Sequence, residues 1–160
     1  MSQTPNDLLK SLFEAQGDNA FIQALGAEIT DAVPGRTTMR LPYSQKLVGN
    51  PDTGVLHGGV ITGLLDHACG MAVGSALGLA VGNVDRSQIS SFATLDLRID
   101  YLKAARPGAD IFVIGECVKV THQILFARGR AFQDSPDDII AAATGTFMMT
   151  TPVAATDVKA

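Results

Sequence analysis

The stretch from Gly54 to Gly70 combines two glycines after a histidine with an isolated acid. His57 is followed by Gly58 and Gly59, and Asp66 comes seven residues later among apolar neighbours. Removing a charged carboxylate from water is energetically unfavourable. Either the face that carries Asp66 is therefore exposed to solvent, or the charge of Asp66 has a function. Asp66 is therefore the first candidate for chemistry.

The two glycines are candidates for a donor site. A long apolar segment begins at Gly58, and N–H groups at the start of a helix lack intrahelical partners and lie at the positive end of the helix dipole. Because glycine has no side chain, a carbonyl group can approach these N–H groups closely, and its oxyanion can be stabilised there. The alternative is that Gly58 and Gly59 only allow close packing of the helix against a sheet.

The apolar segment from about Gly58 to Leu79 predicts one central helix. It contains no proline and is apolar on nearly every face, so it must be covered on nearly every side. The uncharged run from Ala68 to Val84 is marginal in length for a membrane span and begins just after Asp66 and His67. We therefore expect a helix that packs within the protein.

Shorter elements precede the central helix. Residues 4–17 have the pattern of a short amphipathic helix capped by Thr4. The stretches 27–32 and 36–41 flank Pro34-Gly35, which suits the central positions of a type II turn, so a hairpin is expected.

Everything after the central helix is predicted as β-strand. Residues 94–101 alternate polar and apolar side chains, which indicates a half-buried strand. Three more strands are expected at 111–120, 124–132 and 139–150, the four together forming a meander. A strongly curved antiparallel sheet of about six strands can wrap the helix, which makes the fold class α+β. The length suits one domain over residues 1–160.

Composition narrows the classes of function. Hydrophobic residues make up 46% of the chain, which predicts apolar surface buried against another copy of the chain. A net charge of −4 and the lack of a basic run argue against nucleic acid as a partner. Cys69 and Cys117 lie in apolar segments and the first residues are unlike a signal peptide, so we expect a cytoplasmic, reducing setting.

Together these motifs resemble the hotdog fold, and more narrowly the PaaI-like acyl-CoA thioesterases of phenylacetate degradation. The match spans about residues 25–150 and depends on Asn50, Gly54, His57-Gly58-Gly59, Leu65-Asp66, the strand 94–101 and Arg106-Pro107-Gly108. The resemblance implies hydrolysis of an acyl- or aryl-CoA to the free acid and CoA. It also implies that no metal and no bound cofactor take part.

The resemblance implies a role for each motif residue. Asp66 activates water as a general base or attacks the thioester directly, and Gly58 supplies an N–H to the thioester oxygen. Gly59 contributes to substrate binding, and His57 fixes the loop by hydrogen bonding. Asn50 orients the water or the carbonyl, although one extra residue between Asn50 and His57 alters its reach.

A hydroxyl near the carboxylate is also implied by the resemblance, and Thr94 matches its position. Strict alternation would put Thr94 on the same side of its strand as Asp96 and Arg98, so Ser90 or Ser91 could serve instead.

The phosphates of CoA require cations. Lys103 and Arg106 follow the alternating strand, and Arg128 and Arg130 come later in the chain. All four could equally be scattered surface charges.

Helix geometry indicates a shared site. Gly59 and Asp66 are separated by about 10 Å along a helix axis, so one carbonyl cannot reach both in the same chain. We therefore expect the site to join the Gly58 end of one chain to Asp66 of another. A homodimer is the minimum, and the family often pairs dimers into tetramers.

Two other functions stay open. A hotdog dehydratase or hydratase acting on 3-hydroxyacyl or enoyl thioesters could use His57 and Asp66 as acid and base. A non-catalytic protein that binds acyl thioesters is the other alternative, although Gly58 and Asp66 argue against it. The acyl group itself is not specified by the sequence.

Overall fold

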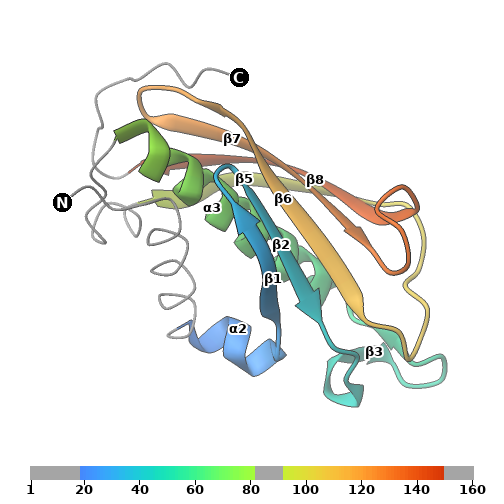
Figure 1. Ribbon diagram of the computed structural model, residues 1–160. Coiled ribbons are helices and arrows are strands. Elements are labelled where there is room, and N and C mark those ends of the chain that lie inside the picture. The colour runs from blue at the N-terminus through green and yellow to red at the C-terminus, as the bar shows by residue number, and fades with distance from the viewer. Residues whose placement is uncertain (1–18, 82–91, 150–160) are drawn as a thin grey trace.

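The computed structural model describes residues 19–81 and 92–149 (Figure 1). The elements in chain order are α2 (Ala20–Leu25), β1 (Glu28–Val33), β2 (Arg36–Leu41), a 3-10 turn (Gln45–Leu47), β3 (Val48–Asn50), β4 (Val55–Leu56), α3 (Gly58–Val81), β5 (Phe92–Tyr101), β6 (Ile111–Val120), β7 (Ile124–Phe132) and β8 (Ile139–Met149). The predicted helix at 4–17 lies outside the described residues. The helix α2 was not predicted; the Asn19 side chain caps it by accepting a hydrogen bond from Ile22 N–H.

The main sheet is antiparallel, with strand order β1-β2-β6-β7-β8-β5, and it curves around α3 (Figure 1). A sheet of six strands around one long helix was expected and is confirmed. The predicted four-strand meander is wrong, because β5 pairs with β8 at the far edge and not with β6. The hairpin strand β2 occupies that side of β6 instead. The strands β3 and β4 pair with each other in a separate two-stranded sheet.

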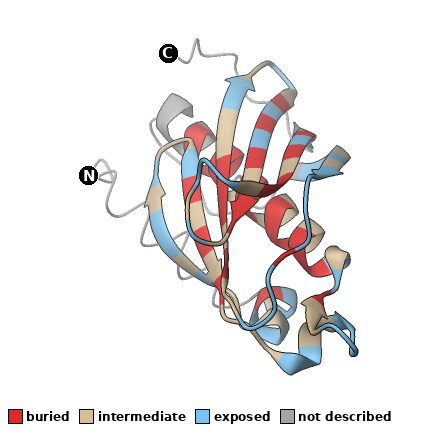
Figure 2. Ribbon diagram, turned by 90° about the vertical axis from the view of Figure 1, so that its right-hand side faces the viewer, coloured by how far each residue is buried: buried red, intermediate tan, exposed pale blue. Residues whose placement is uncertain are grey.

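Close contact between α3 and the sheet sets the position of the helix. A Cβ atom on Gly115 of β6 would lie 2.3 Å from the carbonyl oxygen of Ala68, so only glycine fits there. A Cβ atom on Gly129 of β7 would lie 3.0 Å from Cys69 Sγ. Leu64, Leu65 and Ala68 of α3 are fully buried. In Figure 2 the buried residues of the structure are red. Within residues 19–81 and 92–149, no helix meets the length and hydropathy that a membrane crossing requires.

The predicted hairpin is confirmed, with β1 and β2 joined through Pro34-Gly35. Gly35 has a φ of +78°, as the third position of a type II turn requires. Its N–H donates to Ser75 Oγ of α3 at 3.0 Å, so the turn is also fastened to the central helix.

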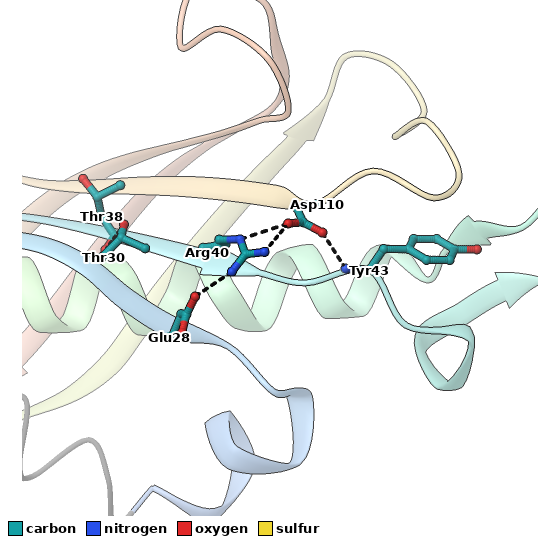
Figure 3. Close-up of polar contacts among 6 residues, drawn as sticks. All are labelled: Glu28, Thr30, Thr38, Arg40, Tyr43 and Asp110. Carbon is teal, nitrogen blue, oxygen red and sulfur yellow. Dashed lines mark hydrogen bonds and ion pairs between the residues drawn. The ribbon is translucent and has the colours of Figure 1, made fainter.

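Arg40 links both ends of the hairpin to the β5–β6 connection (Figure 3). Its guanidinium donates to Asp110 Oδ2 through two nitrogens, at 2.9 and 2.7 Å, and to Glu28 Oε1 at 2.8 Å. Asp110 Oδ1 also accepts from the backbone N–H of Tyr43 at 2.9 Å. The Tyr43 N–H and the Arg40 guanidinium lower the pKa of Asp110 below its ordinary value of 3.8.

The lowered pKa of Asp110 predicts how stability depends on pH. Its contribution is fully present above the unfolded-state pKa and is lost as pH falls through the lower folded-state pKa. We expect Asp110→Asn to lower the free energy of unfolding at pH 7, and the difference from wild type to shrink below about pH 4. Urea unfolding at several pH values measures this. Asp31→Asn, an exposed change on β1, is the control. A difference that does not vary with pH would contradict this account.

Candidate active site

Asp66 lies on the side of α3 that faces β5. Its neighbours Leu64, Leu65 and Ala68 are fully buried against the sheet, whereas Asp66 is partly exposed. Thr94 Oγ1 of β5 donates to Asp66 Oδ1 at 2.9 Å. No ion pair in the described part of the chain involves Asp66. The carboxylate is therefore partly hydrated, oriented by one hydroxyl and not neutralised by a cation there.

A β-bulge explains how Thr94 reaches Asp66. The pairing of β5 with β8 slips between Thr94 and Asp96, so that Thr94 pairs with Phe147 and Asp96 with Thr146. The extra residue reverses the alternation, and Thr94 faces α3 while Asp96 and Arg98 face away from it. The expectation of strict alternation through 94–101 is wrong at this point. Ser90 and Ser91 lie outside the described residues.

The N–H groups at the start of α3 differ in their hydrogen-bond partners. The N–H of Gly59 donates to Nδ1 of His57 at 3.0 Å, and His57 N–H donates to Leu47 O at 2.9 Å. The N–H of Gly58 makes no hydrogen bond to any residue that the structure describes. His57 therefore caps α3 through its side chain, and Gly58 presents the available N–H.

Asn50 ends β3 and organises the turn that follows. Its Oδ1 accepts from Asp52 N–H at 3.0 Å, and its carbonyl accepts from Gly54 N–H at 2.8 Å. No hydrogen bond joins Asn50 to Asp66 or Gly58 among the described residues. Within one chain Asn50 therefore acts as a turn former.

Two groups beside Asp66 are held in their neutral forms. Burial lowers the pKa of His67, and the opposing effect of Asp66 is smaller. Burial and the charge of Asp66 raise the pKa of Cys69 to about 12. Neither residue supplies a cation or a thiolate at neutral pH. Within the described ranges, no three His, Cys, Asp or Glu side chains are grouped so as to hold a metal ion.

Three candidate cations each pair with an acidic residue other than Asp66. Lys103 pairs with Asp138, and Arg106 pairs with Asp134 at 2.8 Å. Both pairs line a surface cavity of about 190 Å³ between the β5–β6 connection and the β7–β8 turn. Arg128 pairs with Glu116 at 2.9 Å. It projects from the outer face of β7, because its neighbour Gly129 faces α3.

Sequence reasoning missed one contact at the helix start. Tyr101, the last residue of β5, donates its hydroxyl to Gly58 O at 2.6 Å. Its hydroxyl also lies 2.6 Å from Thr62 Oγ1. Alternation in 94–101 identified the strand, but only the bulge puts Thr94 and Tyr101 on the same face.

The two halves of the candidate site are therefore separated on one helix. Gly58 presents an N–H with no partner among the described residues, and Asp66 presents an oriented carboxylate eight residues later. That spacing is about 12 Å along the axis. A free donor and a base of this kind are the parts that hydrolysis of a carbonyl compound needs.

Comparison with known proteins identifies the family. Residues 53–140 match the model of the thioesterase superfamily. The medium/long-chain acyl-CoA thioesterase YigI of Escherichia coli is 31% identical over 133 residues, covering 81% of this chain and 84% of YigI. The chain belongs to the thioesterase superfamily. It is a thioester hydrolase, as the motifs predicted.

Other comparisons support the same fold. A protein of Halobacterium salinarum named as an esterase is 36% identical over 104 residues, 64% of this chain, and the match spans 63% of that protein's length. The structure of PaaI from the phenylacetic acid degradation operon of E. coli superposes with a TM-score of 0.76 at 15% identity, covering 94% of this chain and 98% of PaaI. The predicted hotdog fold is confirmed.

Removing the Thr94 hydroxyl tests its contact with Asp66. We expect Thr94→Val to lower thioester turnover about three- to thirtyfold, because a hydrogen bond to a charged group is lost. Thr94→Ser should retain most of the activity. Thr144→Val, on the outer face of β8, is the matched control and should behave like wild type. Thiol release measured with a chromogenic reagent gives the rates. Equal activity of Thr94→Val and wild type would contradict a role for this contact.

Proposed function

We propose that this protein hydrolyses the thioester of an acyl- or aryl-CoA to the free acid and CoA, at sites shared by two copies of the chain. The observation that carries the proposal is the Asp66 carboxylate, partly exposed, oriented by Thr94 and free of a cationic partner within the described ranges. The similarity to YigI, whose name gives medium- and long-chain acyl-CoA as substrates, favours acyl-CoA within the family.

The chemistry follows from these two groups. The N–H of Gly58 donates to the thioester oxygen and stabilises the oxyanion of the tetrahedral intermediate. Asp66 accepts a proton from water as the water oxygen bonds to the acyl carbon, or it attacks that carbon itself and water then cleaves the anhydride. The C–S bond breaks in either route. The leaving thiolate needs little acid assistance, and the products are a carboxylic acid and CoA thiol.

The edge strand β5 supports a shared site. It ends the sheet, and its outer side has no strand partner within the described residues. Leu95 is 53% exposed and Tyr101 51% exposed on this strand, and a long unpaired edge with apolar side chains is suited to pairing with another strand.

The proposed pairing of two β5 strands starts from the contacts that β5 makes within one chain. Thr94 contacts Asp66, and Tyr101 contacts Gly58. Antiparallel pairing of two β5 strands can place Thr94 of one copy opposite Tyr101 of the other, because opposed residues share a face and the bulge puts both side chains on the face toward α3. Asp66 of one copy is thereby brought toward Gly58 of the second. A two-fold dimer then holds two complete sites, which the 12 Å spacing forbids in one chain.

Two candidate cations for the phosphates of CoA are already paired with acidic side chains. Lys103 and Arg106 each have an acidic partner, so a phosphate must displace Asp138 or Asp134 to bind them. Both ion pairs are exposed, and exposed pairs contribute little stability, so the exchange is inexpensive. Arg128 lies on the face of the sheet opposite α3. It could therefore contact a CoA molecule only if the CoA extended around the edge of the sheet or was bound at a site of another subunit.

A substrate screen tests the function itself. Thiol release from short-, medium- and long-chain and aromatic acyl-CoAs should identify a preferred class. Enoyl- and 3-hydroxyacyl-CoAs, followed by absorbance of the enoyl thioester, serve as the comparison for a dehydratase. Release of thiol without a change in the enoyl chromophore is expected. The reverse result, or the absence of turnover across the panel, would contradict the proposal.

Substitution of the acid tests its role. Asp66→Asn retains the volume but removes the base and the nucleophile, so turnover on the best substrate should fall about 10²- to 10⁴-fold. Thermal melting and size-exclusion chromatography should give wild-type values. More than a tenth of wild-type turnover would show that Asp66 is not the catalytic group.

A further inference from the structure

Three oxygen atoms meet where β5 reaches the start of α3. The Tyr101 hydroxyl donates to Gly58 O at 2.6 Å and lies 2.6 Å from Thr62 Oγ1. Thr62 Oγ1 in turn lies 3.3 Å from Gly58 O. Two hydroxyl protons serve one carbonyl in this arrangement, so Thr62 can donate either to Gly58 O or to the phenol oxygen.

The ring of Tyr101 also contacts the helix start. A Cβ atom on Gly58 would lie 3.2 Å from the Tyr101 hydroxyl oxygen and 3.3 Å from Cζ. Glycine at this position therefore does more than admit a substrate, because it also lets the phenol approach the backbone. This contact is the packing role considered as the alternative for Gly58, although its partner is a tyrosine at the end of β5.

These contacts fix one peptide group at both ends. The peptide between Gly58 and Gly59 has its carbonyl held by Tyr101 and its N–H held by His57 Nδ1, at 2.6 and 3.0 Å. First turns of helices commonly fray, since their N–H groups have no intrahelical partners. Because this peptide is held at both ends, the N–H of Gly58, which belongs to the preceding peptide, is expected to keep one direction.

We infer that Tyr101 is a positioning residue for thioester hydrolysis: its hydroxyl, with Thr62, holds the first turn of α3 so that the Gly58 N–H is directed at the oxyanion. The inference rests on the proposed function, and it adds two side chains to the site. Because the N–H interacts more strongly with the oxyanion than with the substrate carbonyl, its misalignment affects kcat more than KM.

A set of hydroxyl deletions tests the inference. Tyr101→Phe retains the ring and should lower kcat about three- to tenfold with KM within twofold of wild type, the size expected for loss of one hydrogen bond. Thr62→Val should lower kcat by a smaller factor, and Thr62→Ser should restore it. The double variant Tyr101→Phe/Thr62→Val should have about the same kcat as Tyr101→Phe alone, because both substitutions disrupt the same hydrogen-bond network.

The controls separate positioning from general loosening of the fold. Thr30→Val removes a hydroxyl that donates to Thr38 O on the hairpin, and it should leave kcat unchanged. Melting temperatures are measured for every variant. A Tyr101→Phe enzyme with wild-type kcat, or one whose loss appears in KM alone, would overturn the inference. If wild type releases no thiol from any acyl-CoA, the proposed function fails instead, so the two failures are distinct.

Discussion

The packing of α3 against β6 and β7 is the constraint on which the rest of the molecule depends. The helix lies so close to Gly115 that no side chain fits between them, and the next contact is with Gly129. Once this face is fixed, the rotation of the helix is fixed. Asp66 is then turned away from β6 and β7 and toward β5, and it remains partly exposed although its neighbours Leu65 and Ala68 are fully buried.

The edge strand β5 then contacts both ends of the helix segment from Gly58 to Asp66. Its Thr94 orients Asp66, and its Tyr101 holds Gly58. Both side chains face the helix only because a bulge between Thr94 and Asp96 shifts the alternation by one residue. The same strand is the exposed edge of the sheet. The side chains that position Gly58 and Asp66 therefore lie at the edge where we propose that a second copy of the chain pairs.

Much of this was predictable from the sequence, for physical reasons that differ between elements. The helix was found because a long apolar run without proline must be covered, and the hairpin because Pro34-Gly35 fits one turn type. The strand order was not predictable, since no local sequence pattern specifies that β6 pairs with β2 and not with β5. The bulge was not predicted either, because residues 94–101 alternate perfectly in sequence and the register shift arises only in the pairing of β5 with β8. Tyr101 was missed for the same reason.

We propose that each site combines Gly58 of one copy with Asp66 of another, and complementation between Asp66→Asn and Gly58→Val, each expected to be inactive alone, tests this arrangement. Asp66→Asn and Gly58→Val are purified separately, then unfolded and refolded together, with subunit exchange verified by tagged chains. A mixed dimer carries both lesions at one site and neither at the other. Random pairing makes about half of the dimers mixed, so activity should recover to about a quarter of wild type. No recovery, with exchange verified, would contradict the shared site.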